Sequence, residues 1–422
     1  MENQTLKYGV VVCKDTLNIG DDIQSYAASC LLPSVDYYIE REHMDVFRPK
    51  EDRPVNAIIN GWFMNNKLGW PLSACINPLY VSMHFCEDDA MLVKSLFLEG
   101  LGSEDLKAHA PVGARDYSTQ MMLERNGIPS YFSGCLTLTL PPKFKKDVVK
   151  SYICLTDISE GAADYIQKKY SGITVKVIEH EPKKLPPLVN KESSWKERFA
   201  EVENLLEIYQ NATAVVTTRL HCALPCLALG TPVLLLNDDD LFELGRLDGL
   251  SELVHTAKTS EFIADLINFD LKNPPRNPES YLQIRNELIH TVSQFVRENA
   301  VCTPELMERF ASYDIEWEKR ALWKNHILQE LINKHVLQWN QNHEAFEKLE
   351  KERQWQENHI VELTKWCQEL ENSREWLRKE ISGLVEENKK LLAANEELTN
   401  RCQERKDTWG LLGKIFDGLL KK

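Results

Sequence analysis

The chain has 422 residues, with 50 Lys and Arg against 64 Asp and Glu, which gives a formal net charge of −14. With 43% hydrophobic residues, this balance is typical of a water-soluble protein of roughly two or three domains. The acidic charge excludes the positive field that binding to duplex nucleic acid requires, and no basic patch with interleaved aromatic residues occurs. We therefore expect no nucleic-acid partner.

Neither export nor membrane insertion is indicated by the sequence. Residues 1–15 have no basic lead, long apolar stretch or small-residue cleavage site, so no signal peptide is predicted. No charge-free apolar run approaches the ~18–20 residues of a membrane-spanning helix. The eleven cysteines are scattered, many of them within apolar runs, as expected for buried thiols in a reducing cytoplasm. These features predict a cytoplasmic protein.

The first half of the chain alternates short apolar runs with helical segments. The strand-like runs lie at residues 8–13, 57–59 and 79–85. This alternation is typical of a parallel sheet with crossover helices. Two prolines and a charge cluster at residues 141–146 then interrupt the pattern and predict a linker. Residues 1–140 are therefore expected to form the first domain.

A second series of strands and helices follows the linker. Its expected strands lie at residues 152–155, 174–178, 214–217 and 232–236, and its helices lie near 161–169 and 195–209. The same βα alternation predicts a second domain of similar size over residues 141–304. The sequence thus predicts an α/β fold with two domains.

After Pro304 the sequence becomes rich in Glu, Lys, Gln, Asn, Leu and Trp and has no further Pro. Leucines recur with a strict spacing of seven at Leu363, Leu370, Leu377, Leu384, Leu391 and Leu398. If these are heptad positions d, the a positions are Ile360, Cys367, Arg374, Ile381, Asn388, Asn395 and Cys402. This pattern predicts a coiled coil within residues 305–406, and the two Asn at a favour a parallel homodimer. The alternative is a single long helix that folds back on its own domain.

The last residues, 407–422, have an amphipathic pattern. The large apolar residues of one predicted helical face are Trp409, Leu412, Ile415, Phe416, Leu419 and Leu420, and the lysines off that face are Lys414, Lys421 and Lys422. This arrangement predicts a short helix at a membrane interface, which would hold the protein at the inner face of the cytoplasmic membrane. Alternatively, the tail packs on its dimer mate or on another protein.

Three segments carry polar residues where a strand gives way to a helix. In the first, Asn18, Gly20 and Asp21 follow the first strand and precede a helical stretch. Glycine lets the backbone approach a ligand, and a helix N-terminus offers free N–H groups to an anion. Simple capping of the helix by Asn or Asp would explain the same residues.

In the second segment, Thr218, Arg219 and His221 stand between an apolar strand and an apolar helix. Open α/β sheets bind ligands at the carboxyl ends of their strands. Arg can hold a carboxylate or phosphate with two hydrogen bonds, and His can transfer a proton near neutral pH. The alternative is an Arg in a structural ion pair beside a helix-capping His.

In the third segment, Arg115 ends a predicted strand and Asp116 begins a helix. This pair could form part of an anion site or only a local salt bridge. Two further groups could hold a metal ion: Cys222 with Cys226 at i, i+4 spacing, and the acidic run at residues 238–240. The cysteines lack a second ligand pair and the acidic run reads as a solvated loop, so no metal site is expected.

Together these segments resemble the polysaccharide pyruvyl transferase family. The resemblance rests on N-x-G-D at residues 18–21, R-D-x-S at 115–118, S-G-C-L-T-L-T at 133–139 and an R-x-H motif at 219–221 followed by G-x-P at 230–232. It covers about residues 8–236, is expected to extend to about 300, and does not include the coiled coil. It implies two facing Rossmann-like domains, as in B-type glycosyltransferases, with the acceptor bound by the first and the donor by the second.

The resemblance also implies an activity. Members transfer the pyruvate skeleton of phosphoenolpyruvate to two hydroxyls of a sugar, forming a cyclic ketal on a surface polysaccharide or its lipid-linked precursor. The roles expected here are acid–base catalysis by His221 and Asp21, donor binding by Arg115, Arg219 and Thr218, and acceptor binding by Asn18, Gly20 and Asn60. No cofactor is expected besides phosphoenolpyruvate as donor substrate.

Two other functions are compatible with the sequence. A B-type glycosyltransferase would use the same architecture with a sugar nucleotide, and Arg219 would hold its diphosphate. A non-catalytic scaffold would use the coiled coil as its working part, but that reading leaves the polar residues at the strand ends without a role.

Overall fold

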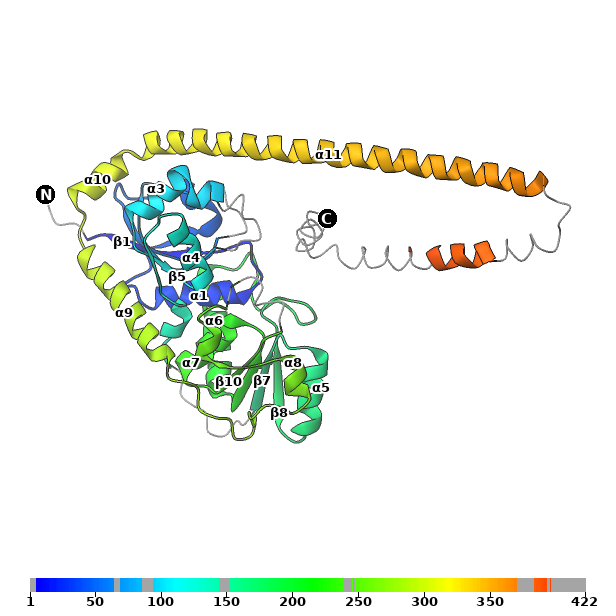
Figure 1. Cartoon of the computed structure of the whole chain (residues 1–422). Coiled ribbons are helices and arrows are strands. Elements are labelled where there is room, and N and C mark those ends of the chain that lie inside the picture. Colours follow the sequence, from blue (N-terminus) through cyan, green and yellow to red (C-terminus); the bar gives the residue numbers. More distant parts are fainter. Residues whose placement is uncertain are drawn as a thin grey trace. The chain divides into compact units, whose positions relative to one another are not determined.

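The structure, a computed structural model, describes residues 5–63, 69–85, 94–143, 152–238, 245, 247–369, 383–392 and 395. The chain divides into two compact units, Met1–Ile327 and Leu328–Lys422. The first unit contains both parallel sheets, and the second consists of helix in its described part (Figure 1).

A six-stranded parallel sheet forms the first domain, with strand order β2-β1-β3-β4-β5-β6. Its strands are β1 (Lys7–Val12), β2 (Tyr37–Glu40), β3 (Val55–Trp62), β4 (Ile76–His84), β5 (Val112–Ala114) and β6 (Ser130–Phe132). Its helices are α1 (Ile19–Ser29), α3 (Gly100–Ala108) and α4 (Tyr117–Arg125), with 3₁₀ turns η1 (Arg41–Val46) and η5 (Leu136–Thr139) and the π-helical turn η4 (Lys94–Leu98). In register, Gly9 of β1 lies between Tyr37 of β2 and Ala57 of β3.

A five-stranded parallel sheet forms the second domain, with strand order β11-β10-β9-β7-β8. Its strands are β7 (Tyr152–Thr156), β8 (Thr174–Ile178), β9 (Ala214–Thr217), β10 (Val233–Leu236) and β11 (His255–Ala257). Its helices are α5 (Glu160–Lys169), α6 (Trp195–Asn211), α7 (Leu220–Leu229) and α8 (Thr259–Ile263), with the 3₁₀ turn η7 (Ser251–Leu253).

The strands and helices begin and end for local reasons. Strands β7, β9 and β10 are buried along their whole length, as expected for apolar runs in a parallel sheet covered on both faces. Helix α6 starts with a capping box in which Ser194 and Glu197 bond each other's backbone N–H groups. Helix α7 ends at Gly230, whose φ of 74° is a left-handed conformation that favours glycine.

Helix α1 packs against α6 and α7, so one hydrophobic core runs through both domains. Within this core Asp22 of α1 accepts two hydrogen bonds of 2.8 Å from Arg198 of α6. Both side chains are almost completely buried, and the remaining Arg198 donors bond the carbonyls of Lys14, Thr16 and Asn190. The ion pair therefore fixes the first helix of one domain against the other domain.

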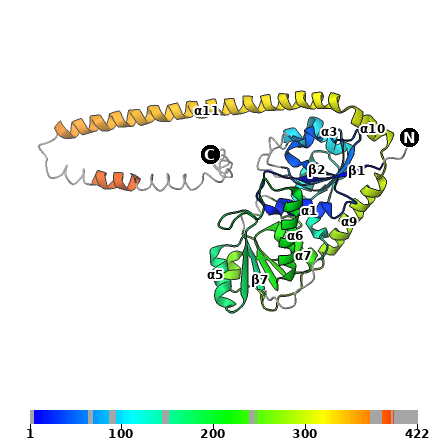
Figure 2. The same cartoon turned by 180° about the vertical axis from the view of Figure 1, so that it is seen from behind.

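After the second sheet the chain returns to the first domain. Helix α9 (Tyr281–Glu298) begins beside α7, where the Tyr281 hydroxyl donates to the Leu227 carbonyl at 2.9 Å. Just beyond its end, the Asn299 carbonyl accepts from Asn56 of β3 at 2.6 Å. Helices α10 (Pro304–Ala311) and α11 (Tyr313–Glu369) follow, and Figure 2 shows α9 alongside both domains from behind.

This architecture confirms the predicted α/β fold with two parallel sheets and a long C-terminal helix. In the predicted coiled coil, α11 and residues 383–392 are helical, and Leu384 and Leu391 are exposed. Leu370, Leu377 and Leu398, the tail at 407–422 and linker residues 144–146 lie outside the described residues, so pairing of the helix stays a prediction. No helix in the described part of the chain is long and apolar enough to cross a membrane.

The buried ion pair leads to a stability prediction. Replacing Arg198 by Met leaves the Asp22 carboxylate buried without its partner, which should lower the free energy of unfolding by about 3–5 kcal/mol. Lys196→Met, at an exposed position of the same helix, should change it by less than about 0.5 kcal/mol. Urea unfolding of both variants measures the difference, and an equally small effect of the two would contradict the role of the pair.

Candidate functional site

The N-termini of α1 and α7 meet at the boundary between the two domains. A Cβ atom at Gly20 would lie 2.9 Å from Oδ1 of Asn18 and 3.3 Å from Cβ and Nδ1 of His221, so any side chain at this position would crowd both neighbours. The Ile19 N–H donates to the His180 carbonyl at 3.1 Å, which joins α1 to the segment after β8. Each helix follows the carboxyl end of a strand, β1 or β9, and N-termini of helices favour anions.

On the first-domain side, the structure brings together Asp21 and Asn60. Both line a small cavity with Gln24 and Arg41 at the carboxyl ends of β1 and β3. Gln24 donates to Asp21 at 3.4 Å, and the Asn60 amide donates to the Gln24 carbonyl at 3.5 Å. Asn18 caps α1 by accepting from the Gly20 N–H at 2.9 Å, so the capping explanation holds for its side chain.

Arg41 is a member of this cluster that no motif of the sequence indicates. Its Nη1 lies 3.5 Å from Asp21, its Nε donates to Glu42 at 3.0 Å, and its side chain is 4% exposed. Although burial disfavours the cation, the neighbouring Asp21, Cys13 and Glu42 raise the pKa of Arg41 above its ordinary value. Arg41 directly follows β2, so its position after a short strand was the available signal. It holds a permanent positive charge beside Asp21.

On the second-domain side, Arg219 occupies the N-cap position of α7 without a capping side-chain bond, and its guanidinium is held in place by two carboxylates. Its Nε donates to Asp157 at 2.7 Å and its Nη2 donates to Glu181 at 2.9 Å. Burial lowers the pKa of Arg219, but Asp157 and Glu181 more than compensate, so the net direction is upward. The Arg219 side chain remains 26% exposed, so the ion-pair explanation applies and part of the side chain still reaches solvent.

Asp157 organises this side of the site, and it too was not identified from the sequence. It directly follows β7 with a φ of 53°, an unusual conformation for a residue other than glycine. Its carbonyl accepts from the Thr218 hydroxyl at 2.8 Å, and its carboxylate accepts from the His180 N–H at 3.1 Å. The strained turn therefore holds Thr218 and Arg219 in position at the strand ends.

Arg115 belongs to a different set of contacts. It is 1% exposed, and its Nε lies 3.5 Å from Asp116. Asp116 caps α4 and bonds His84 at 2.6 Å. Although burial disfavours its charge, His84 and Arg115 hold the pKa of Asp116 below its ordinary value. The local salt bridge expected as the alternative is thus present, while Nη2 of Arg115 has no hydrogen-bond partner within the described residues.

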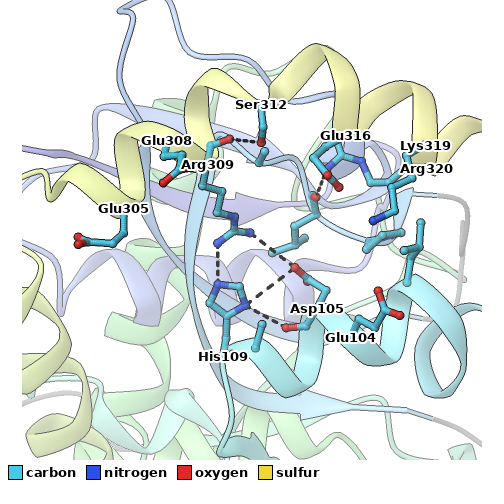
Figure 3. A pocket seen from close by; sticks show the side chains of 15 residues that line it. Glu104, Asp105, His109, Glu305, Glu308, Arg309, Ser312, Glu316, Lys319 and Arg320 are labelled. Carbon is cyan, nitrogen blue, oxygen red and sulfur yellow. Dashed lines mark hydrogen bonds and ion pairs between the residues drawn. The ribbon is translucent and has the colours of Figure 1, made fainter.

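A cavity of about 570 Å³ lies away from these residues, between α3 and the helices α10 and α11 (Figure 3). Arg309 of α10 reaches across it to His109 at 2.6 Å and to Asp105 at 3.5 Å. Burial lowers the pKa of His109, which favours the neutral ring that can accept from Arg309. None of the predicted site residues lines this cavity, and its network attaches α10 to the first domain.

The sequence matches the family described as polysaccharide pyruvyl transferase over residues 18–240. The match begins at the first residue of the Asn18–Asp21 motif, includes Arg219 and His221, and spans more than half of the chain. The chain therefore belongs to the polysaccharide pyruvyl transferase family, while α9, α10 and α11 lie beyond the matched segment.

Solved structures with similar folds share little sequence with the chain. A functionally uncharacterised protein from Klebsiella pneumoniae aligns with a TM-score of 0.34 and 12% identity, over 59% of this chain and 93% of that chain. The UDP-GlcNAc 2-epimerase of Methanocaldococcus jannaschii aligns with a TM-score of 0.33 and 14% identity, over 68% of this chain and 100% of that one. No protein with a curated description matches the sequence.

His180, which anchors α1 through its carbonyl, should make stability depend on pH. Its ring bonds the Tyr209 hydroxyl at 2.7 Å, and burial together with the Arg219 cation lowers its pKa to about 3. The unfolded chain, with a His pKa of about 6.5, binds the proton first as pH falls, so stability is lost below that value. The loss should reach about 2 kcal/mol at pH 5.

The measurement compares thermal unfolding at pH 7 and pH 5 in the wild type and in His180→Gln, which keeps a hydrogen-bonding group but cannot titrate. The acid-induced fall in melting temperature should be smaller in the variant. An equal fall in both proteins would show that His180 is not the titrating group.

Proposed function

We propose that this protein transfers the pyruvate skeleton of phosphoenolpyruvate to two hydroxyls of a saccharide and so forms a cyclic ketal. Membership of the family makes the chain a transferase of polysaccharide biosynthesis. The observation that carries the proposal is the close approach of Gly20 to His221, because it brings together, across the domain boundary, two of the motifs on which the family resemblance rests. A site at this place has access to groups from both domains.

The donor carries a carboxylate and a phosphate, so it needs cationic groups and free N–H donors. Arg219, Thr218 and the N-terminus of α7 are the groups proposed for the phosphate. Arg115 is the proposed partner of the carboxylate, supported by its Nη2 atom, which has no hydrogen-bond partner in the described structure. Binding through Arg115 requires local opening, because this side chain is buried.

The reaction requires one proton to be delivered and two to be removed. His221 gives a proton to the methylene carbon of phosphoenolpyruvate, which turns it into a methyl group and leaves positive charge at C2. One sugar hydroxyl attacks C2 and loses its proton to Asp21, phosphate leaves, and the second hydroxyl closes the ketal. Of the two protons lost by the hydroxyls, the one held by Asp21 passes to the departing phosphate and the other restores His221.

The acceptor is proposed to lie on the first-domain side, against Asn18, Gly20 and Asn60. Arg41 is not proposed to touch the sugar. Because its guanidinium lies 3.5 Å from Asp21 and is itself fixed by Glu42, it acts as a positioning residue for the proposed base. No further cofactor takes part in this scheme.

Two substitutions test the assignment of the donor site. Arg219→Ala removes charge-assisted hydrogen bonds worth about 1.5–3 kcal/mol each, so donor binding should weaken at least ~tenfold.

His221→Ala should lower the rate by about 10² to 10⁴ with the fold intact. The assay follows phosphate release from phosphoenolpyruvate with a panel of free and lipid-linked saccharides, and mass analysis detects the ketal.

Matched controls are Arg125→Ala and His290→Ala, both at exposed positions of the same unit. These should leave donor affinity and rate unchanged. Wild-type behaviour of folded Arg219→Ala would remove Arg219 from the donor site. Release of nucleotide from a sugar nucleotide, with no phosphate release from phosphoenolpyruvate, would instead identify a glycosyltransferase.

The proposed location is the inner face of the cytoplasmic membrane, where lipid-linked saccharides are available. The tail at residues 407–422, which lies outside the described residues, is the proposed membrane contact, and two tails on one dimer would bind more strongly than one. Co-sedimentation with anionic liposomes should recover the full chain and lose a chain that ends at Lys406. Equal recovery of the two would leave the tail as a protein contact.

A further inference from the structure

Helix α11 exposes large apolar side chains that recur seven residues apart. Ile332, Trp339, Phe346 and Ile360 are 53%, 63%, 66% and 60% exposed, and Arg353 occupies the remaining position of the series. A spacing of seven places these residues in one stripe along the helix. Such a stripe of apolar side chains is typical of a helix that packs against a partner.

This stripe has the same phase as the leucine heptads further along the chain. Ile360 is the a position that precedes Leu363, and Ile332 lies four heptads before Ile360. Helix α11 is continuous from Tyr313 to Glu369, so no interruption changes the phase between them. Leu349, at a d position of the same stripe, is also 63% exposed. We call this continuous series of a and d positions the seam, and it begins at about Ile332.

The surface of α11 also has a hollow at the position that a coiled coil requires. A hollow of about 440 Å³ is lined by His335, Val336, Gln338, Trp339 and Asn342. In a parallel two-stranded coiled coil, each side chain at position a of one helix inserts into a hole formed by four residues of the other helix. These are the residues at the preceding d and g positions, the opposite a position and the following d position. For Trp339 these four positions are His335, Gln338, Trp339 and Asn342.

Arg353 interrupts the apolar stripe but is neutralised on its own helix. Its guanidinium donates to Glu350 and Glu357, each at 2.6 Å. Its charge can therefore remain at the edge of the seam while its aliphatic stem packs inside. A shift of the register by one heptad would place Arg353 against Phe346 or Ile360, so this residue favours one alignment over its neighbours.

We propose that the face of α11 formed by Ile332, Trp339, Phe346, Leu349 and Ile360 is a parallel, in-register interface with a second copy of this chain. The hollow around Trp339 lies where the same residue of a parallel, in-register second copy would insert. The chain's own later residues are a poorer occupant, because their leucine heptads continue in the same phase as this stripe through residues 370 and 377. The interface is independent of the proposed chemistry.

The first test uses the full chain and two matched double variants. Trp339→Glu with Phe346→Glu places charges in the seam, whereas Trp355→Glu with Leu337→Glu places them off it, at heptad positions c and f. The pairs match because Trp355 and Leu337 are 64% and 59% exposed, and Trp339 and Trp355 each stack on the His four residues later. Light scattering over a range of concentrations should give a dimer dissociation constant raised at least ~tenfold by the seam variant only.

A second measurement covers the case in which the leucine heptads alone keep the dimer together. Phe346→Cys should form a disulfide with the same residue of another copy on mild oxidation, identified by mass analysis, and Leu337→Cys should not. A 346–346 link can only join two chains. Its absence, a link from 346 to residues 383–422 of the same chain, or equal effects of the two double variants would each overturn the proposal. Loss of transferase activity alone would not affect it.

Discussion

The candidate site depends on the buried ion pair between Asp22 and Arg198. Asp22 lies four residues after Asn18 and one after Asp21, so its bonds to Arg198 fix the N-terminus of α1 against the second domain. Because Gly20 can then lie against His221, groups from both sheets face the same place. Neither charge could stay buried alone, which makes the arrangement of the two domains a condition for forming the pair.

Much of the fold could be predicted because buried parallel strands are continuous apolar runs. Strands β7, β9 and β10 are recognisable for this reason, and the start of α6 is indicated by its capping box. Strands β2, β6 and β11 did not stand out, because they have three or four residues and are only partly buried. Helix α9 was not predicted, although its buried residues Leu288, Val292 and Phe295 recur with helical spacing.

The residues of the candidate site could be predicted only where a short stretch of sequence is enough to indicate a function. Gly20 and His221 were identified in that way. Arg41 and Asp157 were not, because their importance comes from pairing with Asp21 and Arg219, far away in the chain. Arg41 reaches Asp21 because β2 lies next to β1, and strand order is a property of the whole sheet. The position of the Asp157 side chain depends on a left-handed backbone conformation, which an aspartate in the sequence does not indicate.

The chain also closes on itself at the base of the first sheet. Thr5 pairs with Val301 in an antiparallel bridge, and the Leu6 N–H donates to the Ala300 carbonyl at 3.1 Å. The segment before β1 and the segment before α10 are therefore neighbours. A short connection could therefore join the two ends of the two-sheet unit, so a circularly permuted form is topologically accessible, whereas an exchange of the helical extension would also have to preserve the contacts of α10 with the first domain.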